Sequence, residues 1–143
     1  MRSQGDQPQS SVRWRWLYPW GLLFLILLGG LGVRAYRLGA FAFWTDELYH
    51  VVAARSLLET GTPYLPGYAG GVYGRAYPVT YLAARGFDWF GDDEAAARVP
   101  FLVINLVFLV VAFFVVRRWF DVELALIVVG VLALAPHELS LGR

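Results

Sequence analysis

Two adjacent carboxylates, Asp46 and Glu47, are the residues best suited to chemistry, and they follow a cluster of aromatic side chains, Phe41, Phe43 and Trp44. Aromatic side chains are typical of the boundary between membrane and water. Carboxylates beside such a boundary lie in a partly desolvated environment, where a general base can be tuned. Because consecutive residues of a helix point about 100° apart, we expect one acid to face a substrate and the other to hold the scaffold.

A structural interpretation of the same pair stays open. Thr45 is a good N-cap, and the dipole of a helix that begins there favours acids in its first turn. Residue chemistry alone therefore supports catalysis and dipole compensation about equally well.

Three further side chains are candidates for a site. His50 lies one turn beyond Asp46 and suits a metal ligand or a proton relay, but two ligands do not make a metal site, and a lone surface histidine is the favoured interpretation. Arg75 and Arg98 suit phosphate binding. Each arginine can equally pair with an acid, and Arg98 stands one turn after Glu94.

The composition indicates a membrane protein. Of the 143 residues, 58% are hydrophobic and 16% are charged, against roughly 45–50% and about 25% in soluble domains. A net charge of +1 with dispersed arginines argues against nucleic-acid binding. The absence of cysteine excludes disulfides, thiolate zinc sites and a cysteine nucleophile, and no nucleotide-binding, nucleophile-elbow or metalloprotease motif is present.

The elements that must position these residues are membrane helices. We expect an all-α integral membrane protein with a disordered polar tail at residues 1–12 and spans at about 16–33, 99–116 and 122–139. A cleaved signal peptide is the weaker interpretation of the first run, which is longer than a signal's apolar region of about 7–15 residues. The third run, Leu124 to Pro136, has only about 13 apolar residues, which alone would suggest a buried or re-entrant segment.

Arginines indicate the orientation of these spans. Two groups are expected on the cytoplasmic side: Arg2, Arg13 and Arg15 before the first span, and Arg117 and Arg118 after the second. Arg34 and Arg37 at the other end of the first span weaken this asymmetry. Residues 34–98, with Asp46 and Glu47, would then lie on the non-cytoplasmic side.

This external segment carries helical patterns. A helix of about 15 residues is predicted from Thr45 to the stop at Gly61, lying along the membrane surface with its apolar side down. The apolar residues at helical spacing are Leu48, Val51, Val52 and Leu58. A loop rich in glycine and tyrosine follows, then a second interfacial helix from Pro78 to Phe90. Acids at 92–94 open a last helix that leads directly into the second span.

The ordered elements resemble the N-terminal part of the GT-C class of membrane glycosyltransferases, in particular the dolichyl-phosphate-mannose-protein mannosyltransferases and the aminoarabinose transferases of lipid A. The resemblance covers Arg13 to Arg143. The matching residues are Arg37-Leu38-Gly39, Trp44-Thr45-Asp46-Glu47, Tyr49, Ala53-Ala54, Leu57-Leu58, Gly61, Tyr77-Pro78, Tyr81-Leu82, Gly91, Glu94 to Pro100, and Pro136 to Arg143 with Ser140 and Arg143.

The resemblance implies transfer of a sugar from a polyprenyl-phosphate donor to a lipid, glycan or protein acceptor on the non-cytoplasmic face of a bacterial or archaeal plasma membrane. Asp46 would be the general base or acceptor-orienting carboxylate and Glu47 its supporting partner, with substrate contacts from Tyr49, His50, Arg75 and Arg98. No cofactor is implied with certainty, and a divalent metal stays open. Members of the class have many more spans, so this chain resembles only a part of such an enzyme.

Two rival functions remain. A small non-catalytic membrane scaffold or assembly protein would use the same helices and capped acids structurally. A transporter fragment is less favoured, because no span holds an ionisable residue and only Asn105 interrupts one.

Overall fold

The computed structural model describes residues 10–36, 38–40 and 42–135, with side chains from Leu17 onward. Within these residues the chain is all-α and has five helices. They are α1 (Ser10–Ala35), α2 (Thr45–Thr60), α3 (Tyr77–Phe90), α4 (Glu94–Trp119) and α5 (Val122–Leu134). Predictions that concern residues 1–9, Arg37, Phe41 and 136–143 lie outside the described residues, but Ser10 and Ser11, expected in the polar tail, belong to α1.

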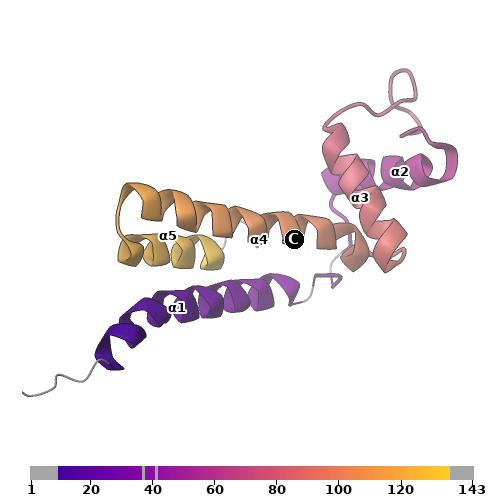
Figure 1. The fold of residues 1–143 in the computed structure, drawn as a ribbon. Helices are drawn as coiled ribbons and strands as arrows, with labels where there is room; N and C mark the ends of the chain where they lie inside the picture. Colours follow the sequence, from indigo (N-terminus) through magenta and orange to yellow (C-terminus); the bar gives the residue numbers. More distant parts are fainter. Residues whose placement is uncertain (1–9, 37, 41, 136–143) are drawn as a thin grey trace, which may run out of the picture.

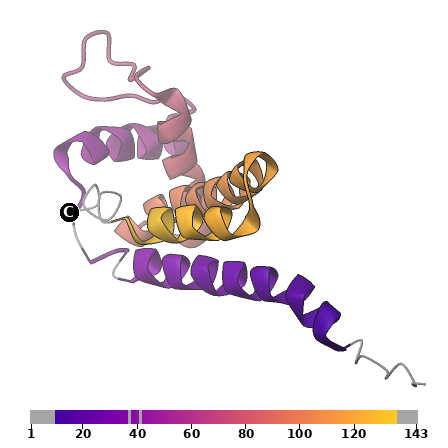
Figure 2. The same ribbon diagram turned by 90° about the vertical axis from the view of Figure 1, so that its left-hand side faces the viewer.

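The helices form two groups. Figures 1 and 2 show α1, α4 and α5 side by side, with α2 and α3 together at the end of the long helices where α4 begins. The core of the first group contains Phe113 and Val129, neither of them exposed, together with Leu23 and Leu109. The second group packs alanines of α2, α3 and α4 around Phe87. Because α4 belongs to both cores, it connects the two groups.

Two helices are long and apolar enough to cross a membrane, α1 over Leu17–Ala35 and the whole of α4. At 1.5 Å per residue, the 26 residues of α4 extend roughly 39 Å, more than a hydrocarbon core of about 30 Å. The 13 residues of α5 extend only roughly 20 Å. This helix ends where Ala135 adopts an extended backbone, which the following proline favours. Of the span predicted at 122–139, the described helix therefore covers Val122–Leu134.

Arg34 joins the end of α1 to the end of α5. Its guanidinium donates to the main-chain oxygens of Leu132, at 3.0 Å, and Ala133. A cation is favourable at the carboxyl end of a helix, where the last carbonyl groups lack partners within the helix. Gly30 permits this packing, since a Cβ there would lie 3.0 Å from the Ala133 side chain. Arg34 therefore has a structural role within the protein. This role accounts for an arginine at the end of the first span where the predicted orientation would place few.

The helices predicted between the first two apolar runs are confirmed, with small corrections. The N-cap of α2 is Trp44 rather than Thr45, because the Glu47 carboxylate accepts the Trp44 N–H at 3.2 Å and so caps the helix from its third position. Gly61 ends α2 with the left-handed φ of 75° that glycine adopts most easily. The next helix begins at Tyr77 rather than Pro78, and α4 continues without interruption from Glu94 through the apolar run.

The apolar residues predicted to form one side of α2 are partly buried and partly exposed in the structure. Val51 and Ala54 are buried against α3 and α4, whereas Leu48 and Leu58 are exposed. The inner residues are needed to pack α2 on α3, so the helix has no single apolar face left for another surface. That α2 lies along a membrane stays a prediction.

Gly86 sets how closely α3 approaches α4. A Cβ at Gly86 would lie 2.2 Å from the main-chain oxygen of Ala96, and neither backbone can withdraw without disturbing the alanine core. We expect Gly86→Ala to lower the free energy of unfolding by about 1–3 kcal/mol. Thermal unfolding followed by circular dichroism in detergent would measure it. Gly29→Ala, where the Cβ meets nothing within 4 Å, is the matched control and should not destabilise the protein.

The fold also predicts which positions lie at opposite ends of the long helices. Residue 62 follows α2 at one end, and Phe120 lies exposed between α4 and α5 at the other. If the long helices cross a membrane in the predicted orientation, an impermeant thiol reagent added to intact cells should label Thr62→Cys and not Phe120→Cys. The chain has no cysteine of its own, so the signal is unambiguous. Labelling of Phe120→Cys alone would show that the orientation is the reverse of the predicted one. Labelling of both variants would show that the long helices do not cross the membrane as predicted.

Candidate functional site

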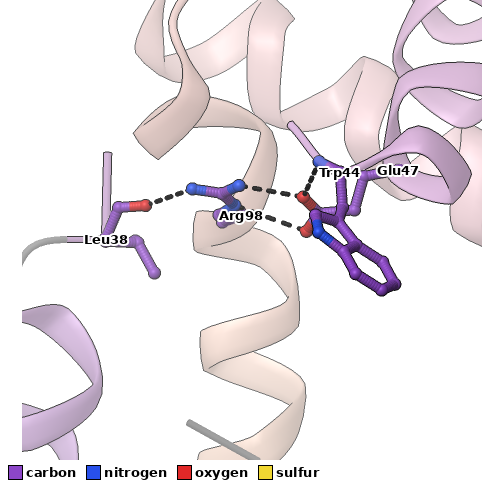
Figure 3. A network of polar contacts seen from close by, with 4 residues as sticks. All are labelled: Leu38, Trp44, Glu47 and Arg98. Carbon is purple, nitrogen blue, oxygen red and sulfur yellow. Dashed lines mark hydrogen bonds and ion pairs between the residues drawn. The ribbon is translucent and has the colours of Figure 1, made fainter. Parts of the chain in front are cut away.

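The predicted acidic pair lies at the start of α2, and an ion pair to α4 holds one of its members. Arg98 reaches Glu47 twice, with its Nη2 2.9 Å from Oε2 and its Nε 3.4 Å from Oε1. Its Nη1 donates to the main-chain oxygen of Leu38 at 2.7 Å. Figure 3 shows the guanidinium between Leu38 on one side and Glu47 on the other. One side chain of α4 thus fixes both the segment after α1 and the start of α2.

Burial strengthens this ion pair. The Arg98 side chain is 11% exposed and the Glu47 side chain 33% exposed, so water screens their attraction less than at an open surface. The ring of Phe43 lies 5.2 Å from the guanidinium carbon and adds a cation–π contact. The Glu47 carboxylate also accepts the Trp44 N–H, so the contacts of this acid are within the protein.

The partner expected for Arg98 was wrong. The ion pair that the structure describes joins Arg98 to Glu47 of α2 and not to Glu94 one turn earlier, because the shared core brings the first turn of α2, with its longer acid, within reach of Arg98. All three nitrogens of the guanidinium donate to groups of the chain. The geometry therefore favours a positioning role for Arg98 over the predicted contact with a substrate.

Asp46 differs from its neighbour. It is exposed, and within the part of the chain that the structure describes it makes no hydrogen bond or ion pair. Consecutive helical positions point in different directions, so Asp46 turns away from the Arg98 contact that holds Glu47. Glu47 is thus bound to the scaffold and Asp46 is exposed, while a contact between Asp46 and a substrate stays a prediction.

His50 is not the lone surface histidine that the sequence favoured. Its Nδ1 lies 2.9 Å from the Thr80 hydroxyl of α3, and its Nε2 lies 3.5 Å from the Tyr73 hydroxyl of the loop between α2 and α3. Partial burial lowers the pKa of His50 below its usual value, while the negative charge of Asp46 one turn away opposes this change. The imidazole therefore joins three segments of the chain one turn from the exposed Asp46 carboxylate.

Tyrosines surround this histidine. The Tyr73 ring lies edge-on to the His50 ring, with centroids 5.0 Å apart, and also contacts Tyr49 at 6.4 Å and Tyr68 at 5.2 Å. Tyr73 is buried at 5% exposure and cannot offer its face to a sugar, whereas Tyr49 keeps 44% of its surface exposed. Arg75 follows two residues later, exposed and without a hydrogen bond or ion pair in the described chain.

Half of the six predicted site residues lie together on one face of α2. Asp46, Tyr49 and His50 share one face of α2 at the spacing i, i+3, i+4. Among the described residues, no three His, Asp or Glu side chains are grouped as metal ligands. A metal on Asp46 would therefore need ligands from elsewhere.

Two contributors to the site were missed from the sequence. Thr80, which is fully buried, lies on the inner stripe of α3 with Ala83, Ala84 and Phe87, at the spacing that marks one helical face. A polar residue on such a stripe needs a buried partner, and this signal could have found it. The role of the Leu38 carbonyl could not be predicted from the sequence, because every residue has a main-chain carbonyl group.

Comparisons with known proteins found no relative of this chain. No protein-family model, no curated protein and no solved structure matches the chain.

The partly buried ion pair of Glu47 predicts that its loss destabilises the protein more than the loss of the exposed acid Asp92. Glu47→Gln removes the charge that balances Arg98, and we expect it to lower the free energy of unfolding by about 1–3 kcal/mol. Asp92→Asn is the control: its carboxylate pairs with Arg55 at the same 2.9 Å, but the side chain is 71% exposed, and the expected loss is less than about 0.5 kcal/mol. Thermal unfolding of both variants measures the contrast, and equal losses would contradict the assigned role.

Proposed function

We propose that this chain forms the N-terminal part of a membrane glycosyltransferase, which moves a sugar from a polyprenyl-phosphate donor to an acceptor on the non-cytoplasmic face. In this proposal α1 and α4 cross the membrane, α5 begins a third span, and α2 and α3 lie outside the cytoplasm. Asp46 is the catalytic carboxylate and Glu47 positions it.

The observation that carries the proposal is the different state of the two neighbouring acids. Glu47 is held by Arg98 and Trp44, whereas Asp46, one residue earlier, is exposed and has no partner in the described part of the chain. Dipole compensation alone would not need one acid to be anchored to another helix. An anchored neighbour keeps the start of α2 in place, so a free carboxylate there is held ready for a substrate.

Arg75 supports the choice of donor. Arg98 is engaged within the protein, but Arg75 has no partner among the described residues and lies on the loop that touches the Asp46 face of α2 through Tyr73. Guanidinium groups bind phosphates through charge-assisted hydrogen bonds. We therefore assign the donor phosphate to Arg75, and the sugar or acceptor contact to Tyr49, which keeps 44% of its surface exposed.

The proposed reaction needs one proton acceptor. An acceptor hydroxyl oxygen attacks the anomeric carbon of the donor sugar, and its proton passes to the Asp46 carboxylate. The bond between that carbon and the phosphate oxygen breaks, and its electron pair stays on the lipid phosphate, whose negative charge the Arg75 guanidinium stabilises. The products are the glycosylated acceptor and the polyprenyl phosphate.

Asp46→Asn tests this role, because the amide keeps the shape of the side chain and cannot accept the proton. We expect sugar transfer by membranes that contain the protein to fall about 10²–10⁴-fold, with radiolabelled polyprenyl-phosphate sugars as donors. Insertion and thermal stability should stay close to those of the wild type.

Glu59→Gln is the matched control, since Glu59 is an exposed acid of the same helix with no described partner. It should leave transfer unchanged. Unchanged transfer by Asp46→Asn would refute the catalytic assignment. A wild-type protein that transfers no sugar while Glu47→Gln disrupts assembly with another membrane protein would favour the scaffold function instead.

A further inference from the structure

The loop between α2 and α3, residues 61–76, carries Arg75 near its end, while hydrogen bonds of Ser56 and Thr60 with Thr62 and Tyr64 hold its start. Figures 1 and 2 show it leading away from the long helices. Pro63, Leu65 and Tyr73 are the buried residues of this loop. Two main-chain hydrogen bonds close it, from Leu65 N–H to Gly71 at 2.8 Å and from Tyr73 N–H to Pro63 at 2.7 Å. Its position on the helices therefore depends strongly on the buried side chains.

Tyr73 makes the polar contact between α2 and the end of this loop that carries Arg75, whereas Ser56 of α2 bonds to Thr62 and Tyr64 at its start. Its hydroxyl lies 3.5 Å from His50 Nε2, and the other ring nitrogen of His50 lies 2.9 Å from the Thr80 hydroxyl. Tyr73 also packs with Leu65 against Ala53, which has no exposed surface. Because Thr80 is fully buried on α3, it holds the imidazole in the orientation that meets Tyr73.

We propose that His50, Tyr73 and Thr80, the His50 cluster, are positioning residues for Arg75, because they fix the loop against the face of α2 that carries Asp46. The inference rests on the proposed phosphate-binding role of Arg75. Each member acts through hydrogen bonds and not by touching the substrate.

The His50 cluster can position Arg75 because Tyr73 and Arg75 are close along the chain. Gly74 alone separates Tyr73 from Arg75, and Ala76 follows directly as the N-cap of α3. Ala76 has a φ of 44°, a left-handed conformation that is unusual for alanine and persists only where its surroundings impose it. Arg75 is therefore held between two fixed points, Tyr73 on one side and the start of α3 on the other. Loss of the Tyr73 contact frees one of them.

Hydrogen exchange in the full chain in detergent tests whether the His50 cluster fixes the loop. Tyr73→Phe keeps the ring and removes the hydroxyl, and we expect the protected amides of Leu65 and residue 73 to exchange about three- to tenfold faster. Tyr68→Phe makes the same change on the same loop, at a hydroxyl with no described partner, and should leave these rates unchanged. Thr80→Val should resemble Tyr73→Phe, and Thr80→Ser should resemble the wild type.

Binding of geranylgeranyl phosphate in detergent micelles tests whether the cluster acts through Arg75. We expect Arg75→Gln to weaken binding about tenfold and Tyr73→Phe to weaken it by a smaller factor. In the Arg75→Gln background, Tyr73→Phe should have no further effect, because the group that it positions is gone. Geranylgeraniol, which lacks the phosphate, should bind all four proteins equally.

Each part can fail separately. Unchanged exchange in Tyr73→Phe would overturn the cluster as the anchor of the loop. Multiplicative losses in the double variant would show that Tyr73 acts independently of Arg75 and would overturn the positioning role. If Arg75→Gln binds the phosphate normally while exchange responds as expected, the donor-phosphate role of Arg75 and the positioning role fail together, and Asp46→Asn still tests transfer by itself.

Discussion

The ion pair between Arg98 and Glu47 is the interaction on which the start of α2 depends. Residues 38–40 and 42–44 have little regular structure, and Arg98 holds this part of the chain and the start of α2 through the Leu38 carbonyl and the Glu47 carboxylate. Arg98 itself stands on α4, which continues without a break from the core shared with α2 and α3 into the long apolar run. This side chain thus ties the start of α2, with Asp46, directly to one of the long helices.

A second set of contacts connects α2 to α3 and is largely apolar. Ala54, Ala83, Ala96 and Ala97 are small enough for three helices to meet closely, and Gly86 lets the α4 backbone approach further. Such packing leaves little room for the helices to shift. The His50 cluster then adds directional contacts at the edge of this core, where the chain leaves regular structure. Rigid helices thus carry the acids, while the tyrosine-rich loop brings the proposed anion-binding group.

The sequence predicted the elements of this fold better than their contacts. Apolar runs of about 18 residues and the stops at Gly61 and Gly91 located α1, α2, α3 and α4 to within a few residues, apart from the earlier start of α1. The pairing of Arg98 with Glu47 was missed, because 51 residues separate them and the closer Glu94 offered a local alternative. The same holds for His50 and Thr80, 30 residues apart. Periodicity reports which face of a helix is buried, but not which neighbouring helix covers it.

The order of the two acids has a geometric reason that applies whether or not Asp46 is catalytic. Glu47 is the third residue of α2, from which a glutamate can reach back to the N-cap N–H and outward to a neighbouring helix. An aspartate there, one methylene shorter, would not reach both Trp44 and Arg98. Exchanging the two acids would therefore place the longer side chain at the free position and the shorter one at the anchor. Scaffold geometry accounts for the glutamate at position 47, whereas the acid at position 46 has the helix dipole as its reason in the fold.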